Sequence, residues 1–496
     1  MPSRRIRNGG VGARSGLLAS AATMEPLDLA VIGAGAAGTS VARTMKQARP
    51  DWSITLFERH QRIGGRLRSV HVPGLDHPIE LGGMRYLTSH RRVQAVITEL
   101  GIATRQFDTR GGTERSFLRG VFGDGPSDPM AGNGYDLAPE ERGRSALDLA
   151  LETFDRIVPG ALTLDADAWR RVRSNGRYLD RPVTDWSLEQ AFSTIRSPEG
   201  HRFTVDAFGY DSGIRPHNVG TVIEYLTSGN DPSIEARVPI EGMDRIPRAI
   251  AERFQSLGGK IRFGTDLRQV TMGEGTVRLG FAGGAPIEAH RVVLALPVSA
   301  LSALAHESPL VGGAGHRRIY GSVEGFPATK LYLWFDRPWW RHAQGPTGIR
   351  TTTDLPLRKV FYFDHGAEGP AAMLAGYTDG RHTRPIVDLA GGATNGEPAP
   401  PELLGAMLEQ LRAIHPATEI PEPMGSAFMH WGSDAHEIAW CYWLAGSNPD
   451  DVIPAAVQPD ASVPIYLCGE SFSRAQAWVE GALETAELVV ERIANA

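Results

Sequence analysis

The stretch Leu29-Ala30-Val31-Ile32-Gly33-Ala34-Gly35-Ala36-Ala37-Gly38 decides the fold of this chain. The run Leu27 to Ile32, which overlaps the start of this stretch, is short and apolar and predicts a buried parallel strand that ends where the glycines begin. Gly33 permits a tight turn, Gly35 lets the backbone approach a pyrophosphate, and Gly38 lets the following helix pack against the strand. The amides that open this helix carry roughly half a unit of positive charge and would face the phosphates.

A carboxylate stands at the end of the next predicted strand. Glu58 lies twenty residues after Gly38 and follows the run Ser53 to Phe57. It can accept hydrogen bonds from ribose hydroxyls, and it repels a 2′-phosphate, so it disfavours NADP. Gly64-Gly65-Arg66 comes soon after, and the two features together indicate a dinucleotide-binding α/β domain and favour FAD as the dinucleotide. A chance glycine loop is the alternative, because a single GxGxxG is weak evidence in a glycine-rich chain.

The composition is that of a large enzyme. The chain has 496 residues, enough for two or three domains, and its formal net charge is −6, so no nucleic-acid partner is expected. Two cysteines, Cys441 and Cys468, exclude a disulfide framework and favour a reducing, cytoplasmic compartment. The longest apolar stretch, Val292 to Ala305, is short and contains Pro297, so no membrane-spanning helix is expected. The histidines and cysteines lack metal-ligand spacing, so no metal site is predicted.

Residues 1–24 are expected to be a disordered tail. The alternative is a weak twin-arginine export signal, which Ser3-Arg4-Arg5-Ile6-Arg7 and the run Gly16 to Ala22 loosely resemble. The tail is favoured because the apolar part is short and is interrupted by Arg14.

The remaining chain indicates interleaved domains rather than consecutive ones. A charged, mostly helical region follows the first nucleotide-binding segment, and the α/β pattern returns at Val238. Three short β-like runs, Leu331 to Phe335, Lys359 to Phe363 and Ala372 to Tyr377, predict a sheet that roofs a pocket. We expect FAD-binding segments over 25–101, 236–310 and 458–496, a helical/substrate domain over 102–235 and a substrate-binding domain over 311–457.

Several motifs occur in the order found in one enzyme family. They are Asp28 to Gly38, Glu58 to Arg66, Glu80-Leu81-Gly82-Gly83-Met84-Arg85-Tyr86, Glu241-Gly242-Met243, Ile465 to Glu470 and Trp478 to Ala482. Through them the chain resembles the flavin-containing amine oxidase family over nearly its whole length. Gly82 to Tyr86 looks like the L-amino acid oxidase branch. Further stretches look similar to the L-tryptophan oxidases of violacein biosynthesis, namely Phe208 to Asp211, Arg337 to Trp340, Leu357 to Lys359 and Tyr377 to Asp379.

The resemblance implies a Rossmann-type FAD-binding domain of the glutathione-reductase-like class, interleaved with a β-sheet substrate domain and a helical domain. It also implies residues that hold FAD. Arg66 would reach the pyrophosphate, Leu267 would present backbone to the adenine, and the Val479 amide would meet the flavin pyrimidine ring. Glu470 would bind flavin-side hydroxyls or phosphate-bound water, although it could equally cap the last helix. The full expected set is Gly33, Gly35, Ala37, Gly38, Glu58, Arg59, Gly65, Arg66, Gly82, Gly83, Met84, Arg85, Leu267, Gly469, Glu470, Trp478 and Val479.

Some monoamine oxidases attach FAD through a cysteine near the position of Cys441, after a tryptophan like Trp431. Here the spacing differs by about one residue, and the similar subgroup binds FAD without a covalent bond. Non-covalent FAD is therefore expected.

Two residues carry the expected chemistry, Arg85 and Lys330. A guanidinium can fork onto a substrate carboxylate and fix the Cα–H above flavin N5, although an internal salt bridge is the alternative for Arg85. In the family, a lysine at the position of Lys330 holds a water at N5 and could assist reoxidation by oxygen, whereas a solvated lysine is the plain alternative. Tyr377 and Tyr210 could donate to the substrate carboxylate, and Trp478 would form an aromatic pocket wall, with core roles as alternatives.

The resemblance implies an FAD-dependent L-amino acid oxidase that converts a free L-amino acid and oxygen into a 2-oxo acid, ammonia and hydrogen peroxide. Aromatic residues near the pocket favour aromatic or apolar substrates, although Asp211 or Asp379 could recruit a basic side chain. A homodimer is the family expectation. Two alternatives stay open, an amine or polyamine oxidase and a non-catalytic dinucleotide-binding module.

Overall fold

The computed structural model describes residues 25–107, 114–213, 215–228, 233–344, 349–363 and 369–495. The expected N-terminal tail or export signal, 1–24, lies outside these residues. Within them, a parallel sheet has the strand order β12 (Lys260–Arg262), β2 (Ile54–Phe57), β1 (Leu29–Ile32), β16 (Val292–Leu294), β24 (Ile465–Leu467). Its strands come from three separate parts of the sequence, so the chain leaves this sheet and returns to it twice.

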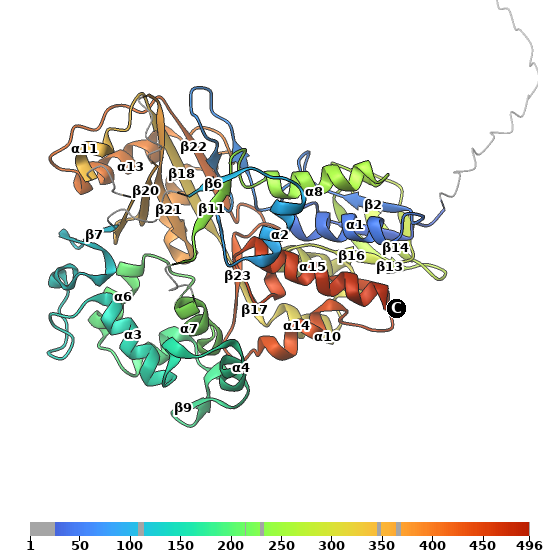
Figure 1. Ribbon diagram of the computed structural model, residues 1–496, viewed down its shortest axis with the longest axis horizontal. Coiled ribbons are helices and arrows are strands. Elements are labelled where there is room, and N and C mark those ends of the chain that lie inside the picture. Colours follow the sequence, from blue (N-terminus) through green and yellow to red (C-terminus); the bar gives the residue numbers. More distant parts are fainter. Residues whose placement is uncertain are drawn as a thin grey trace, which may run out of the picture.

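Both faces of the parallel sheet are buried, as the apolar runs predict. Leu29 and Val31 pack against the helical face, whereas Ala30 and Ile32 belong to the core of the opposite face. The helices on the first face are α1 (Ala36–Ala48), α8 (Arg245–Ser256) and α15 (Val479–Ala494), and α1 contacts the other two. An antiparallel sheet of β13 (Leu267–Met272), β14 (Val277–Phe281) and β15 (Ile287–Ala289) covers the other face. Figure 1 shows this unit beside the second large sheet.

The second sheet confirms the three predicted β runs. Its order in the described residues is β22 (Gly425–Trp431), β18 (Ala328–Phe335), β21 (Ala371–Asp379), β20 (Lys359–Tyr362), β19 (Arg350–Thr353), β7 (Glu114–Leu118), β8 (Val121–Gly123). Side chains alternate along β18: Leu331 and Leu333 pack into a core that includes residues of α13 (Pro401–Ile414). Lys330 and Tyr332 point to the opposite face, because successive side chains of a strand alternate. That face meets the FAD-binding unit.

The helical unit lies at the lower left of Figure 1, below the second large sheet. It contains α3 (Ala146–Ile157), α4 (Ala166–Asn175), α5 (Leu188–Ser193), α6 (Pro198–Phe208) and α7 (Val219–Ser228). Serines begin several of these helices, and Ser145 and Ser187 form complete capping boxes. The expected mostly helical stretch also contains several short strands, β7 and β8 among them. β7 and β8 join the large sheet, because β7 pairs in parallel with β19, a long-range contact without a local signature.

The remaining elements connect these three parts. The apolar stretch considered above divides at Pro297 into β16 and α9 (Val298–Glu307), with Pro297 as the N-cap residue. No helix in the described ranges is both long and apolar enough to cross a bilayer. The other helices are α2 (Arg91–Glu99), α10 (Ala314–Tyr320), α11 (Trp340–Gln344), α12 (Arg384–Ala390) and α14 (Pro449–Val457). The other strands are β3 (Ser69–Val70), β4 (Ile79–Glu80), β5 (Tyr86–Leu87), β6 (Thr104–Gln106), β9 (Arg177–Tyr178), β10 (Arg181–Pro182), β11 (Ala236–Pro239), β17 (Val323–Phe326) and β23 (Trp440–Trp443).

Candidate active site

A cavity of about 410 Å³ extends from the glycine turn of the parallel sheet to the second large sheet. Most residues predicted from the sequence line it. These are Gly33, Gly35, Ala37, Glu58, Arg59, Gly65, Arg66, Gly82, Gly83, Arg85, Leu267, Lys330, Tyr377, Gly469, Glu470, Trp478 and Val479. Three predicted residues are not among the lining residues. Gly38 lies inside α1, Met84 is buried in the core, and Tyr210 stands behind Tyr377.

The glycine turn has the shape that a pyrophosphate requires. Gly33 has φ +101°, and a Cβ there would meet the carbonyl oxygen of Ala295 at 2.5 Å. A Cβ on Gly38 would meet the carbonyl oxygen of Gly33 at 1.9 Å, so both positions exclude larger residues. A Cβ on Gly35 would find only Gly65 Cα, at 3.8 Å, so this glycine is open toward the cavity. The first amides of α1 therefore have room for a phosphate in front of them.

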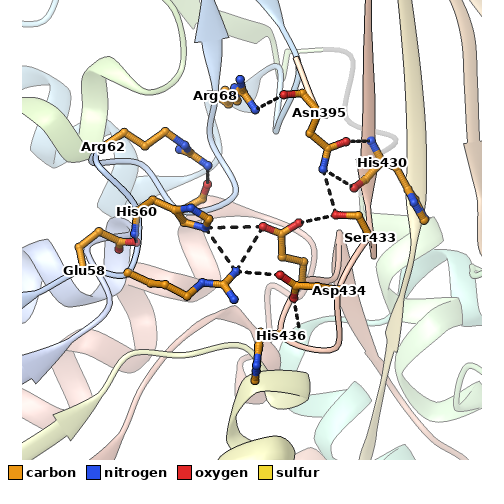
Figure 2. A network of polar contacts seen from close by, with 12 residues as sticks. Glu58, His60, Arg62, Arg68, Asn395, His430, Ser433, Asp434 and His436 are labelled. Carbon is orange, nitrogen blue, oxygen red and sulfur yellow. Dashed lines mark hydrogen bonds and ion pairs between the residues drawn. The ribbon is translucent and has the colours of Figure 1, made fainter. Parts of the chain in front are cut away.

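Backbone hydrogen bonds fix the carboxylate of Glu58 in the cavity wall. The amides of Ala34 and His60 donate to its two carboxylate oxygens, at 2.8 and 2.9 Å. The neighbouring Arg59 forms ion pairs with Asp434 at 3.2 Å and Glu437 at 3.5 Å, so its charge is matched within the protein. Figure 2 shows this network, in which the segment after Glu58 meets the loop that follows β22.

Arg66 and Glu470 form an ion pair across the middle of the cavity. Arg66 Nη1 lies 2.6 Å from Glu470 Oε2, and this carboxylate raises the pKa of Arg66 although burial opposes the shift. The other oxygen of Glu470 accepts hydrogen bonds from the amides of Cys441 and Ala477, both at 2.8 Å. Glu470 thus joins β23, the start of the last helical segment and the Gly-Gly-Arg turn, which makes it an organiser of the site rather than a cap on α15.

Cys441 points away from the cavity. Its thiol is fully buried, is within hydrogen-bonding distance of Ser471 Oγ at 3.2 Å, and is not among the residues that line the cavity. Burial raises the pKa of the thiol, so the reactive thiolate is disfavoured. Both observations fit FAD bound without a thioether.

Lys330 is buried on the cavity side of β18. Its Nζ donates to the carbonyl oxygen of Glu80 at 2.9 Å and to that of Gly82, and it lies 5.0 Å from the ring centroid of Tyr377. Burial lowers the pKa of this lysine, while the Glu80 carboxylate partly restores it. The plain alternative of a solvated lysine is therefore wrong, because the amine is fixed inside the protein.

Arg85 has no acidic partner among the described residues. Its Nη1 is buried without a hydrogen-bond partner in that part of the chain, and its guanidinium lies 5.4 Å from the ring centroid of Phe107. Burial lowers the pKa of Arg85, since no carboxylate compensates the charge. The alternative of an internal salt bridge is therefore wrong for the described residues. An unpaired guanidinium beside a cavity is a site for a carboxylate ligand.

Aromatic rings enclose the space beside Arg85. Tyr377 meets Tyr210 edge-on at 5.7 Å and Trp440 edge-on at 6.2 Å. Trp478 donates through Nε1 to the Tyr225 hydroxyl at 3.3 Å and packs edge-on against His90. Trp440 lines the cavity but was not predicted from the sequence, where its proximity to Cys441 was the only available signal.

The two acids considered for a basic substrate are already engaged. Asp379 accepts hydrogen bonds from the amides of Asp211 and Ser212, both at 2.9 Å. Asp211 accepts from the Arg381 amide at 3.0 Å and forms an ion pair with the Arg381 guanidinium at 2.8 Å. Neither carboxylate is free to receive a substrate cation. Among the described residues there is also no cluster of three or more histidines, cysteines and acids that could hold a metal ion.

Comparisons with known proteins agree with this geometry. The model of the flavin containing amine oxidoreductase family matches residues 36–494. Aplysianin-A from Aplysia kurodai is 27% identical over 94% of this chain and 90% of its own length. An L-amino-acid oxidase from Notechis scutatus scutatus is 23% identical over 93% of this chain and 86% of its own length. The fold is also similar to that of a putrescine oxidase triple mutant, with a TM-score of 0.72 at 18% identity, covering 95% of this chain and 99% of that one. The chain therefore belongs to the flavin-containing amine oxidoreductase family, and the cofactor of its cavity is FAD.

Proposed function

We propose that this protein is an FAD-dependent L-amino acid oxidase. The observation that carries the proposal is the guanidinium of Arg85, which lies beside the cavity and has a buried Nη1 without a hydrogen-bond partner among the described residues. A simple amine has no group to satisfy this cation, whereas the carboxylate of an amino acid does. The similarity to an L-amino-acid oxidase over 93% of the chain supports the same assignment.

The residues around the cavity have defined tasks in this reaction. Arg85 binds the substrate carboxylate, with the Tyr377 hydroxyl as a second donor, and this fixes the orientation of the Cα–H bond. Lys330, held by two backbone carbonyls, places an amine in the cavity wall, where it can hold a water. FAD held by the glycine turn, Glu58 and Arg66 would supply the redox chemistry, as the acceptor for the Cα hydride and the donor of the electron pair that reduces oxygen to hydrogen peroxide. The imino acid leaves and is hydrolysed by water to the 2-oxo acid and ammonia.

An amine or polyamine oxidase is the nearest alternative. A diamine such as putrescine would need free carboxylates in the substrate space, and the described candidates, Asp211 and Asp379, are both engaged. A non-catalytic dinucleotide-binding module is the second alternative. The buried Lys330 argues against it, and so does Arg85, which has no acidic partner in the described part of the chain, because both cations are costly to a protein that uses neither.

One anaerobic experiment separates the three functions. The holoenzyme is mixed with L-amino acids, their D-enantiomers and the corresponding amines, and the flavin absorbance near 450 nm is followed. We expect fast bleaching by L-amino acids, with slow bleaching by amines and none by the D-enantiomers. Bleaching by amines in preference to amino acids would support the amine oxidase, and a flavin that no compound bleaches would support the binding module.

Three further expectations belong to this proposal. We propose a homodimer, which light scattering on the purified holoenzyme tests, and a cytoplasmic location, which cell fractionation tests against twin-arginine export. We also propose an aromatic or apolar substrate, which the aromatic rings around Tyr377 support and which the resemblance of several sequence stretches to the violacein L-tryptophan oxidases favours. A comparison of L-tryptophan with L-alanine as substrate tests this point.

A further inference from the structure

A chain of hydrogen bonds runs from the half-buried Trp440 to the buried Asp379. The indole Nε1 of Trp440 lies 3.0 Å from the Ser212 Oγ, and the Ser212 hydroxyl in turn bonds the Asp379 carboxylate. Ser212 and Asp379 are almost completely buried, with 1% and 0% of their surface exposed. The chain therefore lies inside the protein, where an unmade hydrogen bond is costly.

Donor and acceptor chemistry fixes the direction of this chain. An indole N–H can only donate, so the Ser212 oxygen accepts from Trp440. The serine proton is then left for Asp379, whose Oδ2 also accepts the Ser212 amide. The Asp379 Oδ1 accepts the amide of Asp211. With Asp379 as a carboxylate, each hydrogen bond of the chain has one donor and one acceptor. Removal of the serine hydroxyl would therefore break both the bond from Trp440 and the bond to Asp379.

The chain ends at the substrate space. Asp379 is the last residue of β21, two residues after Tyr377, and Trp440 is the first residue of β23. The rings of Tyr377 and Trp440 meet at an interplanar angle of 89°, and both residues line the cavity. Ser212 itself is not among the lining residues and comes from the segment that follows α6.

We propose that Ser212 and Asp379 are positioning residues that hold the Trp440 indole perpendicular to Tyr377, so that the two rings form a fixed corner for the substrate beside Lys330. This inference rests on the proposed oxidase function. Ser212 does not touch the substrate, and its effect passes through the Trp440 N–H. A rotated indole would leave the carboxylate grip of Arg85 unchanged but would loosen the orientation of Cα.

A double-mutant cycle tests the inference. Ser212→Ala, Trp440→Phe and the double variant are compared in anaerobic stopped-flow reduction by the best L-amino acid substrate. We expect each single variant to lower the rate constant of flavin reduction about three- to tenfold, with the substrate dissociation constant within about twofold. The double variant should be no slower than Trp440→Phe, because Ser212 then has no indole N–H to hold.

The control is Ser322→Ala, which removes another buried serine hydroxyl, one that donates to the Ile319 carbonyl at 2.6 Å and is not among the cavity-lining residues. Full activity of Ser212→Ala, or losses that multiply in the double variant, would overturn the inference. A failure of the oxidase function and a failure of the positioning role give different results. If no L-amino acid reduces the wild-type flavin, the oxidase function is contradicted. If the wild type is reduced normally and Ser212→Ala is reduced at the same rate, only the positioning role is contradicted.

Discussion

The Nζ of Lys359 lies 4.1 Å from the ring centroid of Tyr210, directly behind the aromatic pair that Tyr210 forms with Tyr377. Lys359 is buried, and its side-chain amine makes no hydrogen bond or ion pair with the described residues. Burial lowers its pKa well below the ordinary value, and Arg350 and Arg85 add to the effect. Burial and the neighbouring Arg350 and Arg85 thus disfavour positive charge near Tyr210, so this side of the substrate space is unfavourable for the cation of a basic side chain.

We accordingly expect the enzyme to reject basic side chains. L-Lysine and L-norleucine have nearly the same length, but only lysine carries a side-chain charge. The kcat/KM for norleucine should exceed that for lysine at least about tenfold, which corresponds to about 1.4 kcal/mol. Equal use of both substrates by the wild-type enzyme would contradict the expectation.

Arg85→Met should lower kcat/KM for amino acids but not for amines. A hydrogen bond to a charged group contributes about 1.5–3 kcal/mol, so kcat/KM should fall about 10- to 150-fold. Phenethylamine serves as the control beside L-phenylalanine, because it lacks the carboxylate. Its slow oxidation should change less than about threefold. A loss of less than threefold with L-phenylalanine would show that Arg85 does not grip the carboxylate.

FAD should leave the protein when the protein is precipitated with acid. The Cys441 thiol is buried against Ser471 and kept protonated, so it does not reach the flavin. The yellow colour should appear in the supernatant after trichloroacetic acid treatment, and the pellet should be colourless. Cys441→Ser should keep the wild-type ratio of flavin to protein absorbance. Flavin fluorescence that stays with the pellet in the wild type but not in the variant would establish a covalent bond.

The local signals of the sequence predicted the nucleotide-binding half of the site well. The glycine turn, Glu58 and the buried strands follow from patterns within a few residues of one another, and the structure contains them where expected. The role of Trp440 did not follow, because a tryptophan at the start of an aromatic strand has no pattern that tells which ring faces a cavity. The pairing of β7 with β19 was missed for a related reason, since it joins residues more than 230 positions apart.

A buried histidine should make the protein sensitive to acid. His217 is 2% exposed and stacks on Tyr442 with ring centroids 4.2 Å apart, and burial lowers its pKa to about 3. The native state therefore keeps this ring neutral, whereas the unfolded chain takes up a proton below pH of about 6.5. The contribution of the neutral ring to the free energy of unfolding is therefore complete above that pH. As the pH falls toward 3, this contribution is lost at about 1.4 kcal/mol per pH unit.

His217→Phe preserves a ring against Tyr442 but removes the titrating group. Between pH 6.5 and 5 the free energy of unfolding of the wild type should fall by about 2 kcal/mol more than that of the variant, as measured by urea denaturation of the holoenzyme. His290→Phe is the matched control, because His290 is exposed and should leave the pH dependence as it is in the wild type. Parallel pH profiles for the wild type and His217→Phe would show that this histidine is already charged in the native protein, which its buried position against Tyr442 argues against.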